Sequence, residues 1–372
     1  MIGKVVCLAA YSAAYLAAGL LVGASGTADA RVVVDSAGRS VTIPDRVTKV
    51  ICSGAGSLRL LVYLQAQERV VAVDDIEVKR QKFDARPYSI ANPRLRTLPV
   101  FGEFRGFDRP ERILALETQP EVILKAVVTG TGIDPGALQD KTGIPVVVVD
   151  FGDLGAKRDK LFRSLRLMGE VVDRRERAEA VIAQIESRIA DLARRTPATA
   201  SPPSAFIGGV AFKGPHGFQA TEPSYPPFTF VGVRNLAQRG GATKDVAHAD
   251  VAKEAIVAWN PDYLFLDLAT LQLGEGQGAL AELRTDPGYK SLSAVAERRV
   301  FGLLPYNWYS QNFESILADA YFIGKVVHPA GFADVDPAAE ADRIFEFFVG
   351  QKVFRQMDAE FGGLVFKPVP LD

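Results

Sequence analysis

Aromatic side chains gather in two stretches that follow neither a helical nor a strand period. One spans residues 212–228 and the other spans residues 305–309. Aromatic rings outside a regular period either pack irregularly within loops or line a cavity. We expect a cavity, with the rings packing on a planar organic ligand; burial within the loops is the alternative for each ring, because large apolar groups usually end up buried. The candidate contacts are Tyr225, Tyr306, Trp308 and Tyr309.

Three cations indicate where anionic groups of a ligand could bind. Arg86 precedes a Pro-Tyr pair, and Arg105 follows a phenylalanine in a short loop. A guanidinium group pairs well with carboxylate or phosphate-like groups, although solvation at the surface is the commoner fate of an arginine. Lys125 and Thr129 lie at and after the carboxyl end of an apolar strand, where open α/β sheets place their ligands. We therefore select Arg86, Arg105 and Lys125 as candidate binding residues.

The segment Ser53-Gly54-Ala55-Gly56-Ser57 predicts a turn between a strand and a helix. Backbone N–H groups at such a helix start can accept an anion or a carboxylate-rich ligand. The third glycine of a dinucleotide fingerprint is missing, so a nucleotide site is not indicated. Gly54, Gly56 and Ser57 are thus candidate ligand contacts, and a simple tight turn is the alternative.

Histidine and cysteine are too sparse to predict a dedicated metal cage. His216, His248 and His328 occur singly, without the spacing of a structural zinc site. Cys52 lies in an apolar stretch and is expected to be a buried thiol. A metal ligand in the chain is therefore left unassigned, and His216, in the first aromatic stretch, is the one histidine selected as a candidate ligand contact.

The bulk composition excludes several classes of partner. The chain has 372 residues, with 43 Lys and Arg against 44 Asp and Glu, so nothing favours nucleic acid or an anionic membrane. Hydrophobic residues make up 48% and charged residues 23%, which is typical of a globular protein rather than a disordered or multi-span one. We expect a soluble monomer that binds no nucleic acid.

The first thirty residues are typical of an export signal. Lys4 precedes an uncharged, mostly apolar run over 5–22, and Ala28-Asp29-Ala30 has the small-x-small pattern read by signal peptidase. We expect cleavage after Ala30 and a periplasmic location; a retained membrane anchor is the alternative, because 18 residues is the lower edge of what spans a bilayer. Cys7 lies at the start of the apolar run, not its end, so a lipoprotein is not indicated.

Strand and helix patterns alternate along the rest of the chain and predict an α/β fold. A hairpin over 32–43 opens a first lobe over 31–155, in which strands are expected at 47–51, 69–73, 122–125 and 146–149 and helices at 58–65, 110–116 and 135–141. Residues 157–195 have helical periodicity, within a segment 156–196. Asp173 and Glu176 have capping-box spacing and predict the start of a second helix there.

A second lobe is expected over 197–372, and it begins with a linker rich in Pro and Ser at 197–204. Its predicted strands are 205–210, 263–266 and 300–304, and its predicted helices are 251–258, 313–327 and 337–348. The lobes share a signature of Glu-x-Ile-x-Ala followed by Pro and an apolar strand, starting at Glu111 and at Glu254. Its repetition indicates two similarly built lobes with mainly parallel sheets.

The chain resembles the helical-backbone (class III) periplasmic solute-binding proteins, which serve ABC importers of iron-siderophores, haem and cobalamin. The resemblance covers essentially the whole chain after residue 30 and is carried by the order and spacing of several motifs: Val41-Thr42-Ile43-Pro44 with Val50-Ile51, residues 68–75, 111–116 and 260–265, and the Arg-rich helix from Arg175. It implies two α/β lobes joined by a single long helix over about 174–194, with the ligand cleft between 31–155 and 200–372. One rigid helix between lobes implies only modest closure.

The resemblance also implies a function. It points to capture of a metal chelate, most simply an iron-siderophore, for delivery to a membrane permease, with no tightly bound cofactor. Haem or another tetrapyrrole would be an alternative ligand, with a tyrosine or His216 on the iron. Glu111 and Glu254 match the position of the acidic residues that meet permease arginines in this family; their different downstream spacing leaves the equivalence open.

Two other ligand classes and an enzyme are the competing hypotheses. Oxyanions such as molybdate or tungstate can be held by backbone amides, which leave little trace in a sequence. Free zinc or manganese would call for more histidines and carboxylates. The nucleophile elbow, phosphate-binding loop and zinc-hydrolase motifs are missing from the sequence, so we expect no enzyme.

Overall fold

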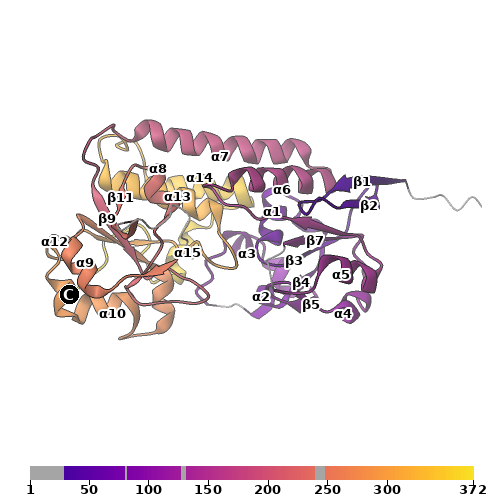
Figure 1. The fold of residues 1–372 in the computed structure, drawn as a ribbon, viewed down its shortest axis with the longest axis horizontal. Coiled ribbons are helices and arrows are strands. Elements are labelled where there is room, and N and C mark those ends of the chain that lie inside the picture. Colours follow the sequence, from indigo (N-terminus) through magenta and orange to yellow (C-terminus); the bar gives the residue numbers. More distant parts are fainter. Residues whose placement is uncertain (1–28, 80–81, 127–130, 239–247) are drawn as a thin grey trace, which may run out of the picture.

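The computed structural model describes residues 29–79, 82–126, 131–238 and 248–372. The chain forms two lobes side by side, each built around a mainly parallel sheet, as the sequence predicts (Figure 1). Thr129 and almost all of the predicted export signal lie outside the described residues. In the part of the chain that is described, no helix combines the length and apolar character needed to cross a membrane.

The first lobe contains a six-stranded sheet in the order β6-β5-β4-β3-β7-β8. All neighbouring pairs are parallel except β5 and β6. The predicted hairpin is confirmed as β1 (Ala30–Val34) and β2 (Ser40–Pro44). The sheet strands are β3 (Val50–Ser53), β4 (Val70–Asp74), β5 (Val100–Glu103), β6 (Phe107–Asp108), β7 (Val122–Ala126) and β8 (Val146–Val149), and the helices are α1 (Ser57–Tyr63), α2 (Asp75–Lys79), α3 (Pro87–Ala91), α4 (Pro110–Leu114) and α5 (Pro135–Thr142).

The second lobe contains a four-stranded, fully parallel sheet in the order β11-β9-β13-β14. A short antiparallel pair, β10 (Ala220–Thr221) with β12 (Ala249–Asp250), lies beside it. The sheet strands are β9 (Ser204–Gly208), β11 (Arg234–Asn235), β13 (Tyr263–Asp267) and β14 (Val300–Leu303). The helices are α8 (Pro226–Phe230), α9 (Lys253–Trp259), α10 (Gly278–Thr285), α11 (Pro287–Lys290), α12 (Ser293–Ala296), α13 (Phe313–Val327), α14 (Pro337–Val349) and α15 (Phe354–Glu360).

The two sheets repeat one arrangement, which explains the shared signature. In the first lobe β7 lies between β3 and β8, and in the second lobe β13 lies between β9 and β14. The helix before each middle strand, α4 or α9, carries the signature and buries one isoleucine completely, Ile113 or Ile256. Each helix therefore covers its sheet through the same signature position.

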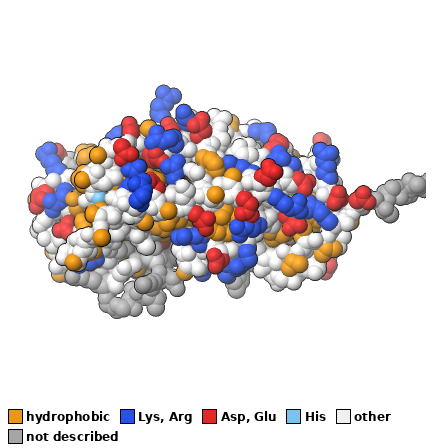
Figure 2. Space-filling view, turned by 90° about the horizontal axis from the view of Figure 1, so that it is seen from above, with side chains coloured by type: hydrophobic (Ala, Val, Ile, Leu, Met, Phe, Trp, Pro, Cys, Tyr) orange, Lys and Arg blue, Asp and Glu red, His pale blue; other side chains and the backbone are white. Residues whose placement is uncertain are grey.

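The segment between the lobes contains two helices: α6 (Arg158–Val171), which packs on the first lobe, and α7 (Arg175–Arg195). The 21-residue α7 runs along both lobes at the top of Figure 1, which matches the single long interlobe helix implied by the resemblance. Its apolar face packs on both lobes through residues such as Ile182 and Ile185, as its period predicts. On the outer face, seen from above in Figure 2, cations and carboxylates are interspersed. This surface therefore has no large patch of purely positive or purely negative charge.

The predicted capping box at the start of α7 is wrong. The N-cap is Arg174, and no side chain caps this helix end. Asp173 adopts a left-handed backbone with φ 46°, because the chain turns sharply between α6 and α7 at this residue. Its carboxylate lies 3.6 Å from Arg31 instead of reaching the first turn of the helix.

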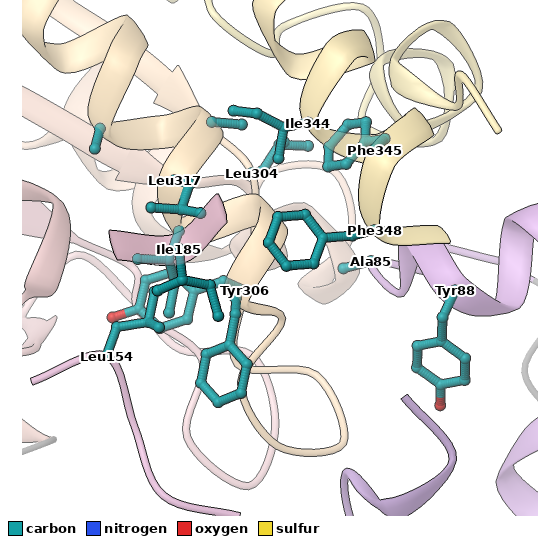
Figure 3. Close-up of a cluster of buried hydrophobic side chains, with 14 of the residues drawn as sticks. Ala85, Tyr88, Leu154, Ile185, Leu304, Tyr306, Leu317, Ile344, Phe345 and Phe348 are labelled. Atoms are coloured by element: carbon teal, nitrogen blue, oxygen red, sulfur yellow. The ribbon is translucent and has the colours of Figure 1, made fainter. Parts of the chain in front are cut away.

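An apolar core continues from one lobe into the other. Figure 3 shows Phe345 and Phe348 of α14, in the second lobe, within the same cluster of buried side chains as Ala85 and Tyr88 of the first lobe. The Phe348 ring also lies 4.9 Å from the ring of Tyr63 on α1. All of these side chains are buried. Wide opening of the lobes would expose this apolar surface to water, which is unfavourable.

Candidate ligand-binding site

A cavity of about 560 Å³ lies between the two lobes. The first lobe contributes Ala55, Ile76, Phe104 and Arg105, and the second lobe contributes residues 211–214 and 307–310. Ala55 and Ile76 follow the carboxyl ends of β3 and β4, and residues 211–214 follow the end of β9. Parallel sheets place ligands at this edge, so the fold itself directs both sheets toward the cavity.

Each lobe presents a phenylalanine and a cation to the cavity in the same local arrangement. Arg105 lies over the ring of Phe104, 4.9 Å from its centroid, and Lys213 lies over the ring of Phe212, 5.3 Å from its centroid. Both cations have left-handed backbones, with φ 65° and 56°, and a glycine follows each. The two rings are also exposed, at 37% and 42%. Exposed rings of this size beside a cavity are typical of a binding surface.

Neither of these cations is paired with a carboxylate among the described residues. Arg105 and Lys213 are both solvent-exposed, and each comes from a different lobe. A guanidinium or ammonium group near an apolar cavity attracts anionic groups, and the aromatic rings offer flat apolar contacts beside them. The cavity can therefore accept a ligand that has anionic groups and a flat or apolar body.

Trp308 and Tyr309 form one of the cavity walls that the second lobe provides. The Tyr309 hydroxyl donates to the carboxylate of Asp74 in the first lobe and accepts a hydrogen bond from the Arg105 backbone N–H at 3.2 Å. Burial and the charge of Glu77 raise the pKa of Asp74 well above its ordinary value. Burial and the Asp74 charge likewise raise the pKa of Tyr309, so its hydroxyl stays protonated and serves as a donor.

The glycine-rich turn before α1 is held by close contacts with the protein itself. A Cβ atom at Gly54 would lie 2.2 Å from the carbonyl oxygen of Ala126, and one at Gly56 would lie 1.9 Å from the ring of Phe151. The Ser57 hydroxyl donates to the Leu124 carbonyl at 2.9 Å. The cavity is lined by Ala55 of this turn, and not by Gly54, Gly56 or Ser57.

Arg86 and Lys125 are buried in ion pairs and do not line the cavity. Arg86 lies 2.8 Å from Asp84 and 2.9 Å from Glu77, and its side chain is 2% exposed. Lys125 donates to Asp108 and to the Gly106 carbonyl at 3.2 Å. Lys125 thus supports the loop that carries Arg105, while Arg105 itself faces the cavity.

Tyr225 and Tyr306 lie inside the second lobe. Their rings stack with centroids 5.6 Å apart, and Figure 3 shows Tyr306 within the buried cluster. The Tyr306 hydroxyl donates to Glu222, whose burial raises its pKa to about 7. Of the four candidate rings, Trp308 and Tyr309 line the cavity, whereas Tyr225 and Tyr306 do not.

His216 lies behind Phe212 and lines a smaller, separate cavity. One of its ring nitrogens, Nε2, is 2.7 Å from the Phe212 carbonyl oxygen, and its ring centroid lies 5.4 Å from that of His248. Among the residues that the structure describes, no three His, Cys, Asp or Glu side chains are grouped as they would be around a metal ion.

Glu111 and Glu254 are exposed and occupy the first turns of α4 and α9. Figure 1 places these two helices on different lobes along the side opposite α7. Each lobe thus carries the glutamate of its signature, exposed, at the start of a helix.

Sequence reasoning located the cavity loops more successfully than the individual contacts. Ile76 was missed altogether. Phe212, Lys213 and Asn307 lie in the stretches selected for their aromatic content, and Phe104 precedes the selected Arg105, but none of these four residues was selected itself. The repeated Phe-cation-Gly triplet at 104–106 and 212–214 is the signal that could have identified the two phenylalanines and Lys213.

The two lobes, the single long connecting helix and the cavity between them define a solute-binding protein. The chain belongs to the periplasmic binding protein family, whose sequence model matches residues 50–306. This confirms the resemblance found in the sequence. Proteins of this family deliver small-molecule ligands to the permeases of ABC importers.

Individual relatives are distant. The molybdate-binding protein MolA of Haemophilus influenzae is 20% identical over 82% of this chain and 87% of its own. The structure of MolA bound to molybdate has a TM-score of 0.64 to this one, with 19% identity over 87% of this chain and 98% of MolA. A periplasmic solute-binding protein from Veillonella parvula scores 0.67, with 18% identity over 91% and 97% of the two chains, and the periplasmic haem-binding protein HutB of Vibrio cholerae scores 0.54, with 16% identity over 76% and 100%. These similarities support the fold.

Proposed function

We propose that this protein captures an anionic metal chelate, most simply an iron-siderophore, and delivers it to the permease of an ABC importer. The observation that carries the proposal is a pair of cations on opposite lobes of one aromatic-lined cavity, Arg105 and Lys213, neither of which is paired with a carboxylate of the described residues. Negative groups on a chelate would neutralise both cations as the lobes close on it.

The size of the cavity favours an organic chelate over a bare ion. Pockets of about 300–1,000 Å³ are typical for ligands of drug-like size, and this cavity of about 560 Å³ lies within that range. A four-oxygen anion would leave most of this space empty and would not contact the aromatic walls. An oxyanion such as molybdate is nevertheless a second candidate, because MolA is named for molybdate.

The state of the potential iron ligands favours a metal that arrives already coordinated. The Tyr309 hydroxyl is engaged by Asp74 and by the Arg105 N–H, and His216 contacts the Phe212 carbonyl outside the main cavity. Direct coordination of haem iron by either residue would break these contacts. A chelate that fills its own coordination sphere requires no such change.

Export and docking complete the proposal. We infer that the chain is exported, cleaved after Ala30 and active as a periplasmic monomer. Arg31 would then be the first residue, and its guanidinium is held by the carbonyls of Glu170 and Val171 at 3.0 and 3.2 Å. Glu111 and Glu254, one on each lobe, would meet the permease.

Calorimetry with defined probes tests the ligand class. We expect tight, stoichiometric binding of an anionic iron(III) tris-catecholate complex, weaker binding of a neutral iron(III) trihydroxamate complex, and little binding of molybdate or free zinc. Tight binding of molybdate with no response to either iron complex would overturn the chelate in favour of the oxyanion.

A further inference from the structure

Arg59 links the two lobes from a completely buried position. It lies on α1 of the first lobe and is 0% exposed. Its guanidinium donates to the backbone carbonyls of Trp308 and Gln311, both at 2.8 Å, and of Tyr309 at 3.0 Å. Three carbonyls of one loop in the second lobe thus converge on a single side chain of the first lobe.

The loop that Arg59 holds carries the cavity wall formed by Trp308 and Tyr309. Trp308, Tyr309 and Ser310 line the cavity, whereas Arg59 does not. Tyr309 and Ser310 are consecutive non-glycine residues with left-handed backbones, at φ 48° and 70°. Such conformations are unfavourable and persist only where surrounding contacts impose them.

Contacts inside the second lobe join the two ends of this loop. The Asn312 side-chain amide donates to the carbonyls of Tyr306 at 2.9 Å and Trp308 at 3.3 Å. Contacts from the first lobe hold the middle of the loop, namely those of Arg59 and the bond from Tyr309 to Asp74. The position of the wall therefore depends on both lobes at once.

The surroundings of Arg59 favour a single orientation of its side chain. The guanidinium lies 5.1 Å from the ring centroid of Tyr88 and 5.7 Å from that of Phe151. Burial raises the pKa of the neighbouring Glu314 carboxyl, and the Arg59 charge opposes that rise. A fork of donors between two rings is preorganised, so little conformational freedom is lost in holding the three carbonyls.

We propose that Arg59 is a positioning residue for ligand capture, which sets the Trp308–Tyr309 wall against the first lobe without touching the ligand. The effect on affinity rests on the proposed function of the cavity, whereas the effect on the wall does not. Removing the fork should release the loop and weaken capture, although every side chain that lines the cavity remains.

Trp308 reports the position of the wall in ligand-free protein. In a Trp259→Phe background Trp308 is the one tryptophan of the chain, and we expect Arg59→Met to raise its quenching by acrylamide at least about twofold, because the loop would open more often. Arg177→Met is the matched control. Arg177 also joins the lobes through carbonyls, donating to Tyr63 at 2.9 Å and to Phe347, but these bonds do not involve the loop that carries the wall.

Two outcomes would overturn the proposal: unchanged quenching in folded Arg59→Met, or an equal rise in Arg177→Met. If Arg59→Met fails to fold, Arg59→Lys keeps the charge but lacks the fork, and unchanged quenching in that variant would overturn the proposal equally. With the iron(III) tris-catecholate complex as probe, affinity should fall about tenfold in Arg59→Met and remain unchanged in Arg177→Met. If the parent protein does not bind that probe, the proposed ligand fails, while the quenching result still decides the role of Arg59.

Discussion

The hydroxyl of Tyr309, in the second lobe, donates a hydrogen bond to the buried carboxylate of Asp74, in the first lobe. Tyr309 lines the cavity, and Asp74 is the last residue of strand β4, whose carboxyl end faces the cavity. The bond therefore joins the two lobes at the site where a ligand would bind.

Tyr309→Phe should lower the free energy of unfolding by about 1–2 kcal/mol, because a buried carboxyl group loses its donor. Denaturant unfolding of Tyr309→Phe, Asp74→Ala and the double variant measures the coupling directly. The two substitutions should be strongly non-additive. Simple addition of their effects would show that the bond contributes nothing.

Arg105→Ala and Lys213→Ala should each weaken binding of an anionic chelate by about 1.5–3 kcal/mol, the scale of a hydrogen bond to a charged group. The loss should shrink as salt is added, because both cations are exposed and screened. Calorimetry at two ionic strengths measures this. Lys290→Ala, an exposed lysine of the same lobe outside the cavity, is the control and should bind normally. If all three variants bound the chelate with the affinity of the parent protein, Arg105 and Lys213 would not be part of the binding site.

Stability should fall as the pH rises through about 7, because burial raises the pKa of Glu222 from 4.5 to about 7 and that of Asp267 from 3.8 to about 7. Between the ordinary and raised pKa values the folded state binds protons that the unfolded chain has released. The stabilisation is thus complete below the unfolded pKa and is lost above the folded one.

Glu222→Gln keeps an acceptor for the Tyr306 hydroxyl but cannot ionise. Relative to the parent protein, it should be more stable at pH 8.5 than at pH 5 by roughly 1–3 kcal/mol, because only the parent protein acquires a buried charge over this range. Denaturant unfolding across this range is the measurement. Glu275→Gln, an exposed glutamate of the same lobe, should leave the pH profile unchanged. A Glu222→Gln profile parallel to that of the parent protein would contradict the assignment.

Glu111→Ala combined with Glu254→Ala should strongly slow ligand uptake by cells while leaving ligand affinity and Tm nearly unchanged. Both carboxylates are exposed, so they are available to a permease, and each also lies in a first helical turn, where the helix dipole favours a carboxylate. Uptake assays and melting curves separate the two roles. Normal uptake would exclude docking, and a lowered Tm with a proportionate loss of uptake would indicate helix stabilisation instead.

Local patterns in the sequence were sufficient to predict most of the fold. The helix α13 (Phe313–Val327) begins and ends at the predicted residues, because its apolar period and the flanking residues determine both ends. The start of α7 was misjudged at Asp173, since capping-box spacing does not reveal a left-handed turn imposed by the packing of α6 against α7.

The site was less predictable because it depends on contacts between residues far apart in the chain. Arg86 and Arg105 look alike as arginines beside aromatic residues, yet Arg86 is buried with Asp84 and Glu77, and Arg105 faces the cavity. The three carbonyls that Arg59 binds lie 249 to 252 residues further along the chain. Nothing in the local sequence around Arg59 indicates these contacts. Only the packed fold brings these groups together.

Native mass spectrometry of the protein purified from the periplasm, with metal analysis of the bound species, tests the central claim most directly. The account predicts one iron-containing organic adduct per chain that is lost in the Arg105→Ala, Lys213→Ala double variant. A molybdenum or tungsten oxyanion retained by that double variant would contradict it.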